Sequence, residues 1–268
     1  MPELPEVEIT RRGLLSLVDQ QIKSVTIRNA SLRWPIPADL DEILRHQHIL
    51  QLSRRAKYII AHCENGVLLM HLGMSGRLML LPEFTPPAKH DHLDIAFAGG
   101  QVLRLRDPRR FGAVLWHEDT HHPLLTSLGI EPLEDAFNGD YLYEHIRTRS
   151  AAIKIVIMDG HLVVGVGNIY ASEALFRAGI DPKTPANKVS RARCKKLAQE
   201  IKATLAAAIE AGGSSLRSFF GVDGSPGYFQ QEYFVYGRTG QPCKVCATPI
   251  KLLKQGQRST FYCSTCQR

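Results

Sequence analysis

The sequence contains no long apolar run. Its longest apolar stretches, such as Gly66–Met70 and Leu162–Val166, are far shorter than the roughly 20 residues that a membrane-spanning helix needs. There is also no leader in which positive charge precedes an apolar segment, so we expect a cytoplasmic protein that does not enter membranes. A length of 268 residues indicates two modest domains rather than one, and 44% hydrophobic residues with no internal repeat indicate a packed protein.

Cysteine is scarce, and acidic residues are outnumbered by basic ones. The 33 basic and 26 acidic residues leave a net charge of +7, which is compatible with a polyanionic partner without establishing one. The segment from Arg238 to Arg268 holds six Lys or Arg residues and no Asp or Glu. Only six cysteines are present, and we interpret the isolated Cys63 and Cys194 as ordinary thiols.

The other four cysteines form two Cys-x-x-Cys pairs, Cys243 with Cys246 and Cys263 with Cys266, separated by sixteen residues. Four thiolates suit one tetrahedral Zn²⁺ with bonds of about 2.3 Å, and the gap fits a β-hairpin. A redox role is disfavoured because two such pairs lie in one basic terminal segment. The basic residues partly offset the charge of a Cys₄ zinc site, and zinc fingers also bind proteins, so the module alone does not establish nucleic-acid binding.

The hydrophobic pattern predicts a β-rich first half behind one helix. The helix is expected from Pro5 to about Val18, because proline suits a first helical turn and Glu6 and Glu8 suit its positive end. The expected strand-rich segments are Lys23–Asn29, Ile49–Cys63, Val67–Leu81 and Leu93–Trp116, with a hairpin turn at Gly99-Gly100 and a loop over Leu81–His92.

After about Gly129 the pattern becomes helical. Asn168 is expected to cap a helix that Gly179 ends, and Arg193–Ala211 has helical spacing that stops at Gly212-Gly213. Leu216–Tyr228 is rich in Gly, Ser and Phe and is predicted to be a mobile loop. We therefore expect domains over residues 1–130, 131–237 and 238–268.

The N-terminus carries a second chemical pattern. Removal of Met1 is common before a small residue such as Pro2, and it would expose a secondary amine. An α-amino group has an ordinary pKa of about 7.7–8, so part of it is neutral near pH 7 and can form a Schiff base. Glu3 stands beside it as an acid or base, and Glu6 lies one helical turn further on. On spacing alone, the simpler interpretation is favoured, namely that Pro2, Glu3, Pro5 and Glu6 only start a helix.

Strings spread along the chain change this interpretation. They are Pro2-Glu-Leu-Pro-Glu-Val-Glu8, Arg54-Arg-Ala-Lys57-Tyr, His71-Leu-Gly-Met-Ser-Gly76, Asp107-Pro-Arg-Arg-Phe-Gly112 and Gly165-Val-Gly-Asn-Ile-Tyr-Ala-Ser-Glu173. With the tail from Gln257 to Gln267, they resemble bacterial formamidopyrimidine-DNA glycosylases over essentially the whole chain. The resemblance implies an α+β protein: an N-terminal β-sandwich with a leading helix, a helix–two-turns–helix domain and a C-terminal zinc-finger β-hairpin.

The resemblance also implies a bacterial, monomeric DNA repair enzyme. Its partner would be double-stranded DNA containing oxidised purines, such as 8-oxoguanine and formamidopyrimidines, or abasic sites. Pro2 would attack C1′ with the help of Glu3, and the resulting imine would permit β,δ-elimination. Lys57 matches an essential lysine near the lesion, for which phosphate binding and proton donation are both open roles.

Further residues carry over by the same matches. Met74, Arg109 and Phe111 correspond to residues that fill the gap left by an extruded nucleotide, with Arg109 facing the orphaned cytosine. Arg258 corresponds to an arginine beside the lesion, which we expect to stabilise the departing phosphate; the alternative is a surface arginine that offsets the zinc site. The remaining expected DNA contacts are Glu6, His71, His90, Arg149, Lys154 and Asn168. We interpret Lys89-His-Asp-His92 as part of the segment that contacts DNA rather than as a metal cluster.

Three other functions fit parts of the sequence less well. The sibling glycosylase for oxidised pyrimidines, endonuclease VIII, is disfavoured by three features: Leu4 and Val7 in the first motif, the set Met74, Arg109 and Phe111, and the long loop Leu216–Tyr228. A non-catalytic DNA- or RNA-binding zinc protein is disfavoured by the intact set Pro2, Glu3 and Lys57. A protein-interaction zinc module is disfavoured only mildly, by the basic tail and the turn before Asn168.

Overall fold

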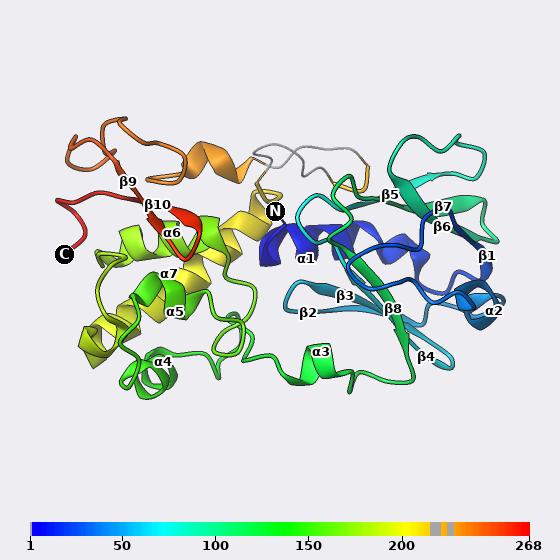
Figure 1. Ribbon diagram of the computed structural model, residues 1–268, viewed down its shortest axis with the longest axis horizontal. Helices are drawn as coiled ribbons and strands as arrows, with labels where there is room; N and C mark the ends of the chain where they lie inside the picture. Colours follow the sequence, from blue (N-terminus) through cyan, green and yellow to red (C-terminus); the bar gives the residue numbers. More distant parts are fainter. Residues whose placement is uncertain (1, 215–220, 224–227) are drawn as a thin grey trace. The chain divides into compact units, whose positions relative to one another are not determined.

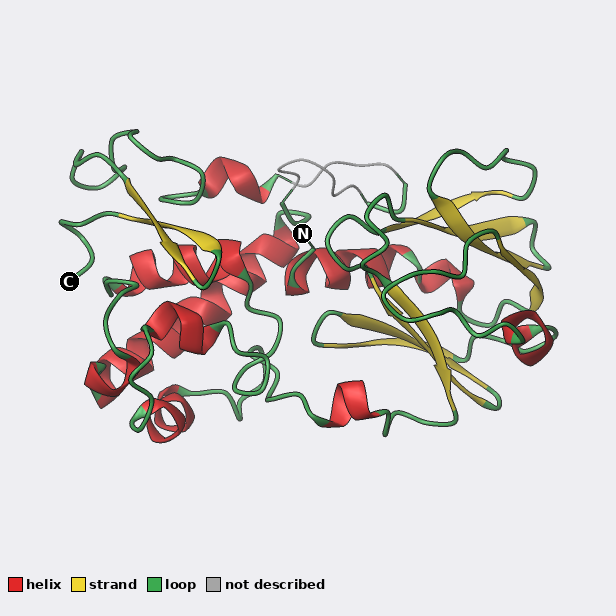
Figure 2. Ribbon diagram, viewed as in Figure 1, coloured by secondary structure: helices red, strands yellow, loops and turns green. Residues whose placement is uncertain are grey.

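The computed structural model describes residues 2–214, 221–223 and 228–268. Its contacts define two compact units: Met1–Thr126 with Ala211–Tyr228, and Ser127–Glu210 with Phe229–Arg268. The first unit is built from sheets and a leading helix, whereas the second is mainly helical and carries a two-stranded hairpin (Figures 1 and 2). The predicted α+β class is therefore confirmed. Most of the predicted loop Leu216–Tyr228 lies outside the described residues.

The leading helix α1 (Leu4–Gly13) is shorter than predicted. Its first turn contains Pro5, where no backbone N–H is needed, and its buried residues include Leu4 and Val7. The prediction that it extends to Val18 is wrong, because the chain tightens into a 3₁₀ turn over Leu15–Leu17. The three-residue repeat of that turn buries both Leu14 and Leu17 completely, while Leu15 between them is exposed.

The first unit contains two four-stranded antiparallel sheets, ordered β1-β6-β7-β5 and β2-β3-β4-β8. Their strands are β1 (Ile22–Ile27), β2 (Gln51–Arg55), β3 (Tyr58–Cys63), β4 (Gly66–His71), β5 (Arg77–Pro82), β6 (Asp91–Phe97), β7 (Gln101–Arg106) and β8 (Ala113–His117), with short helices α2 (Leu40–Leu44) and α3 (Pro123–Thr126). Alternate residues of β6, such as Leu93 and Ile95, share one core with Leu68 and Val114 of the other sheet. The predicted sandwich is confirmed, and Gly100 (φ +77°) turns the predicted hairpin between β6 and β7.

The second unit consists of α4 (Gly139–Ile146), α5 (Ile153–Ile157), α6 (Asn168–Ala178), α7 (Arg191–Glu210) and the hairpin β9 (Lys251–Gln255) with β10 (Arg258–Tyr262). Gly179 adopts φ +71° and ends α6, as predicted. The prediction that Asn168 caps this helix is wrong. Gly167 occupies the cap position, and the Asn168 side chain is bound elsewhere.

None of the helices formed by the described residues is both long and apolar enough to cross a membrane.

Candidate functional site

Pro2 and Glu3 are buried at the start of α1. The Glu6 carboxylate holds this segment in place: Oε2 accepts the backbone N–H of Glu3 at 2.8 Å, and Oε1 accepts the backbone N–H of Ser214 at 2.9 Å. Because Glu6 is only 1% exposed, these contacts make it a support for the N-terminal residues. Its predicted contact with DNA stays a prediction.

Lys57 occupies the two-residue turn between β2 and β3. The preceding Ala56 adopts φ +54°, and its carbonyl accepts a hydrogen bond from Nη1 of Arg54 at 2.9 Å. Nε of Arg54 also lies 3.4 Å from Oε2 of Glu8, which is in α1. The hairpin that carries Lys57 is thus tied to the helix that begins beside Pro2.

His71, at the end of β4, is paired across the sheet with Tyr58, the residue after Lys57. Burial and the positive charges of Lys57 and Arg33 lower the pKa of His71 to about 4, although Asp107 acts in the opposite direction. A neutral imidazole agrees with the geometry, because Nδ1 of His71 accepts the backbone N–H of Gly73 at 3.0 Å. His71 therefore supports the turn that presents Met74.

The low pKa of His71 predicts a pH-dependent stability. The unfolded chain binds the proton near pH 6.5, whereas the folded chain does so only near pH 4, so stability falls as pH decreases through this window. Between pH 7 and pH 5 the wild type should lose about 2 kcal/mol more free energy of unfolding than His71→Gln. Urea denaturation of both proteins at the two pH values measures this difference. Equal losses would show that His71 is protonated normally in the fold.

Met74 and Phe111 lie on neighbouring loops and are 38% and 45% exposed. The Arg109 guanidinium carbon lies 4.7 Å from the centre of the Phe111 ring. The two loops approach each other closely at Gly73, because a Cβ there would lie 2.4 Å from the backbone carbonyl carbon of Phe111. Only glycine fits at this position without a shift of the backbone. Sequence composition alone would favour a core role for the two apolar residues, but the structure presents them, with Arg109, on one surface.

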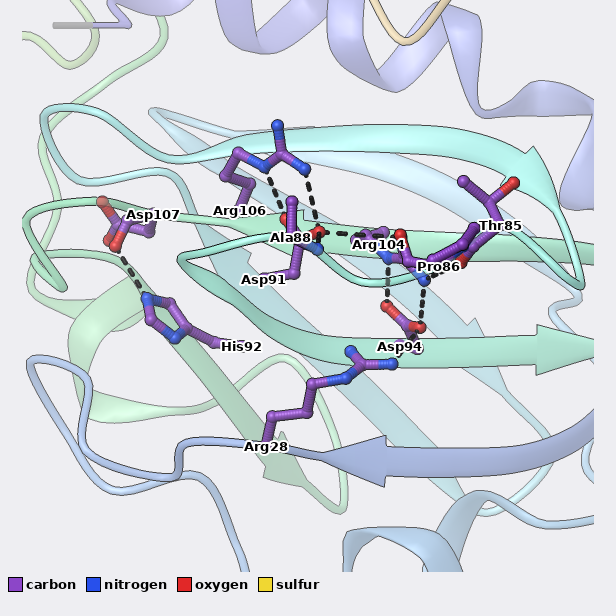
Figure 3. A network of polar contacts seen from close by, with 10 residues as sticks. All are labelled: Arg28, Thr85, Pro86, Ala88, Asp91, His92, Asp94, Arg104, Arg106 and Asp107. Carbon is purple, nitrogen blue, oxygen red and sulfur yellow. Dashed lines mark hydrogen bonds and ion pairs between the residues drawn. The ribbon is translucent and has the colours of Figure 1, made fainter.

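His90 ends the loop between β5 and β6 with φ +74°. The loop is anchored by the fully buried Arg104, which donates to the carbonyls of Thr85 and Pro86 at 2.9 and 3.0 Å and to the Asp94 carboxylate (Figure 3).

The two residues after His90 turn inward. Asp91 binds Arg106, and Nε2 of His92 lies 2.8 Å from the Asp107 carbonyl (Figure 3). Among the described residues, only the four cysteines bring together enough ligand atoms for a metal. Lys89-His-Asp-His92 is accordingly not a preformed metal cluster.

In the second unit, Arg149 and Arg258 line a cavity of about 630 Å³ together with Ser150, Ile155 and Asp159. Arg149 is paired with Asp159 at 2.7 Å, whereas Arg258 is exposed at the start of β10, next to the turn of the hairpin formed by β9 and β10. The cavity thus combines two guanidinium groups from separate segments with one carboxylate, a net positive lining that suits an anionic group such as phosphate.

Lys154 lies in the interior of the second unit and is 1% exposed. Its ammonium donates to Oδ1 of Asn168 at 2.7 Å, to the carbonyl of Ser259 at 3.0 Å and to Oγ1 of Thr260 at 2.7 Å. A lysine ammonium has three N–H donors, and these acceptors lie in two different elements, α6 and β10. Lys154 therefore joins α5, α6 and the strand that begins with Arg258, and its predicted contact with DNA stays a prediction.

The four cysteines of the C-terminal module fit a zinc ion. Their sulfur atoms all lie within 4.8 Å of one another, with 3.4 Å between Cys246 and Cys263 and 3.9 Å between Cys243 and Cys266. Tetrahedral Zn–S bonds require a sulfur separation of about 3.8 Å. Hydrogen bonds from the side chain and backbone of Thr248 lower the pKa of Cys246 to about 6, whereas burial and the neighbouring thiols raise the pKa of Cys266. A metal ion would bind all four as thiolates.

In each cysteine pair a backbone N–H points to the sulfur atom of the first cysteine. The N–H of Val245 points to Sγ of Cys243 and that of Cys266 to Sγ of Cys263, each at 3.5 Å. The intervening residues form the hairpin of β9 and β10, as predicted. The expected cofactor, one structural Zn²⁺, is supported by these ligands.

Sequence reasoning missed Glu173, which is fully buried in α6. Its carboxylate accepts the backbone N–H groups of Phe234, Val235 and Tyr236 at 2.8–3.0 Å, and burial raises its pKa despite these bonds. Glu173 thereby attaches the segment that leads into the zinc module to α6. The only hint in the sequence is an acidic residue among the apolar residues of a helix.

Comparison with known protein families divides the chain into three matched regions. Residues 1–114 match the family described as Formamidopyrimidine-DNA glycosylase N-terminal domain, and residues 128–220 match the Formamidopyrimidine-DNA glycosylase H2TH domain. Residues 240–268 match the zinc finger found in FPG and IleRS. Together the matched regions include every predicted site residue.

Individual relatives match over their full length. The formamidopyrimidine-DNA glycosylase of Methylobacillus flagellatus is 63% identical over all of this chain and 97% of its own, and that of Janthinobacterium is 56% identical over all of both chains. A crystal structure of the Thermus thermophilus MutM (Fpg) protein, 36% identical, superposes with a TM-score of 0.89 over 99% of this chain and 98% of its own. Lactococcus lactis Fpg in complex with DNA containing an abasic site is 34% identical, with a TM-score of 0.91 over 99% of both chains.

Proposed function

The chain belongs to the formamidopyrimidine-DNA glycosylase family and is a DNA repair glycosylase with a zinc finger; from this premise we propose that it removes oxidised purines from double-stranded DNA through the Pro2 amine and then cleaves the abasic site by β,δ-elimination. The 8-oxoguanine and formamidopyrimidine substrates follow from the family match. The same match disfavours endonuclease VIII and the two non-catalytic alternatives.

The observation that carries the proposal is the support built around the N-terminus. Two backbone N–H groups, of Glu3 and Ser214, converge on the Glu6 carboxylate, which fixes the residue next to Pro2. A nucleophile held in place attacks with a smaller loss of entropy than a mobile chain end would. The bond to the Glu3 N–H is part of a capping box, which by itself only starts a helix, whereas the bond to Ser214 ties this start to a segment about two hundred residues away.

The proposed reaction starts when Met1 has been removed. The Pro2 nitrogen forms a bond to C1′ as the bond from C1′ to the damaged base breaks, and Glu3 exchanges protons with the opening sugar. The resulting imine acidifies the C2′ proton, and its loss expels the 3′ phosphate. A second proton loss then expels the 5′ phosphate. Lys57 is proposed to bind phosphate or donate a proton in these steps.

The second unit is proposed to bind the DNA backbone. Arg149, Arg258 and the N-terminal turn of α6 at Asn168 present cationic groups and backbone N–H groups suited to phosphates. Arg258 would position the departing phosphate and stabilise its charge, because an arginine does not readily give up a proton. Lys154, itself a predicted DNA contact, also holds Asn168 and the start of β10 together. Bound zinc would hold the hairpin in shape through Cys243, Cys246, Cys263 and Cys266.

Solved relatives support the DNA partner. Lactococcus lactis Fpg has been crystallised with DNA containing an abasic site, and also with DNA containing an N7-benzyl-Fapy-dG lesion. We extend binding of such DNA to this chain as a monomer. The domain boundaries at residues 130 and 237 stay predictions.

The proposal is tested by trapping the imine. Borohydride should link the protein covalently to an 8-oxoguanine:cytosine duplex, and peptide mapping should place the adduct on Pro2. An undamaged duplex of the same sequence is the control and should give no adduct. An adduct found solely on Lys57 would overturn the assignment of the nucleophile.

Arg109→Ala should relax the preference for cytosine opposite the lesion. A guanidinium that pairs with the orphaned base is worth about 1–3 kcal/mol of discrimination, so the excision ratio between cytosine and adenine partners should fall about tenfold. The neighbouring Arg110→Ala is a matched control, because Arg110 is also exposed but lies outside the predicted set. Equal losses opposite both bases would make Arg109 a phosphate-binding residue instead.

A further inference from the structure

Asp107 lies where three loops of the first unit meet. Its side chain is completely buried, although a carboxylate is costly to remove from water. Oδ1 accepts the hydroxyl of Ser75 at 2.7 Å and the backbone N–H of Arg109 at 3.3 Å, and Oδ2 accepts the backbone N–H of Gly112 at 2.8 Å. Ser75 also accepts the N–H of Arg109 at 3.1 Å, so hydroxyl, amide and carboxylate form one small network.

The main chain of Asp107 reaches the third loop. Its N–H donates to the carbonyl of His90 at 3.0 Å, and its own carbonyl lies 2.8 Å from Nε2 of the buried His92 (Figure 3). The same carbonyl accepts the N–H of Arg110, which adopts φ +58°. Asp107 thus contacts the loop before β6 and the loop after β7 through its backbone.

Each partner of the Asp107 side chain is, or adjoins, a residue of the proposed DNA surface. Ser75 follows Met74, Gly112 follows Phe111, and Arg109 is bound through its own backbone. The neighbouring acidic residues differ, since Asp91 and Asp94 bind the arginines of β7. Asp107 is the carboxylate that ties together the loops carrying the gap-filling residues.

Close backbone contact reinforces this network. A Cβ at Gly112 would lie 2.8 Å from the carbonyl oxygen of His71 and 3.1 Å from Oδ2 of Asp107. Gly73 makes a similar approach to Phe111 from the opposite loop. With no side chains between them, the two loops have little room to move apart while the carboxylate keeps its hydrogen bonds.

We infer that Asp107 is a positioning residue that pre-organises Met74, Arg109, Phe111 and His90 as one rigid wedge for the duplex. The inference rests on the proposed function, because it assigns these four side chains to DNA. An apolar side chain replaces lost base stacking only where it is held, and a loop ordered beforehand avoids the entropy cost of ordering it on binding. Asp107 itself touches neither base nor sugar and acts through the loops that it joins.

The test compares Asp107→Ala and Asp107→Asn with the wild type. Asp39→Ala is the matched control, because Asp39 is an exposed aspartate of the same unit whose side chain caps no helix. Three quantities are measured: the cytosine-over-adenine excision ratio on duplexes, the fluorescence of a 2-aminopurine beside the lesion, and borohydride trapping on a single-stranded abasic oligonucleotide. The last substrate has no opposite strand and no base to extrude, so it does not need the wedge.

Asp107→Ala should lower kcat/KM on the lesion duplex on the order of 10²-fold, the cost typical of a misplaced site. The excision ratio should fall towards one and the 2-aminopurine response should be lost, while single-stranded trapping stays within about threefold of the wild type. Asp107→Asn keeps one oxygen acceptor, so it should recover most of the ratio and the fluorescence response.

Two results would overturn the inference while the proposed function stands. One is an unchanged ratio and fluorescence response in Asp107→Ala. The other is a parallel loss of single-stranded trapping in both variants, which would mean that Asp107 only maintains the fold of the whole unit. A wild-type protein that neither traps nor discriminates would refute the proposed function, and this inference with it.

Discussion

Placing four residues, Gly-Ser-Gly-Ser, between Met1 and Pro2 should abolish borohydride trapping and lower lesion excision at least about 10³-fold. In this variant the Pro2 nitrogen becomes part of a peptide bond, and its lone pair is no longer nucleophilic. The new terminal amine lies up to about 13 Å away along the chain and cannot replace it. The loss should be this large because no later step proceeds without the covalent imine.

The matched control is Pro2→Gly, which keeps a small second residue and therefore a free terminal amine. It should still be trapped, more slowly than the wild type, because glycine lacks the ring that restricts the backbone beside the buried Glu3. Gel analysis of trapped complexes and single-turnover excision measure both variants. Trapping of the extended chain at the wild-type level would show that another amine is the nucleophile.

Loss of zinc should have the second largest effect. Cys246→Ser is expected to release the metal and disorder the hairpin of β9 and β10. Binding to a duplex with an abasic analogue should then weaken about 10²-fold, because the displaced Arg258 can no longer form the charge-assisted bonds to DNA phosphate that we propose for it. The sandwich should stay folded, because the buried cluster that includes Cys243 and Cys263 is separate from the core of the first unit. Elemental analysis measures the zinc content, fluorescence anisotropy measures DNA binding, and circular dichroism shows whether the sandwich stays folded.

Arg258→Ala distinguishes the contribution of the arginine to DNA binding from that of the metal. This variant should keep one zinc ion per chain, bind lesion DNA more weakly and leave less of the final product on a pre-formed abasic site. Active wild-type protein without zinc would contradict the role of the metal. Normal binding and products in a zinc-loaded Arg258→Ala would leave Arg258 only the alternative of offsetting the charge of the zinc site.

Local patterns were read correctly from the sequence where the residues that cooperate are close in the chain. The hairpin at Gly99-Gly100 needs only a turn and two alternating strands, and it is present. Helix ends were less predictable, because α1 stops at Gly13 so that both Leu14 and Leu17 reach the core. Gly167 rather than Asn168 is the N-cap of α6, and the Asn168 side chain binds Lys154 and the carbonyl of Ser259 instead.

The sequence by itself determined the zinc ligands and the family, since four cysteines within 24 residues and several strings in order leave little room for other interpretations. Only the tertiary structure decided what Lys154, Glu173 and Asp107 do. Lys154 is expected on the surface from its charge, yet it is buried because Thr260, more than a hundred residues away, supplies an acceptor. Asp107 joins two loops because the Ser75 hydroxyl and the Gly112 N–H both donate to its carboxylate. A buried polar group is stable only when distant segments supply its hydrogen bonds, and sequence spacing does not encode that meeting.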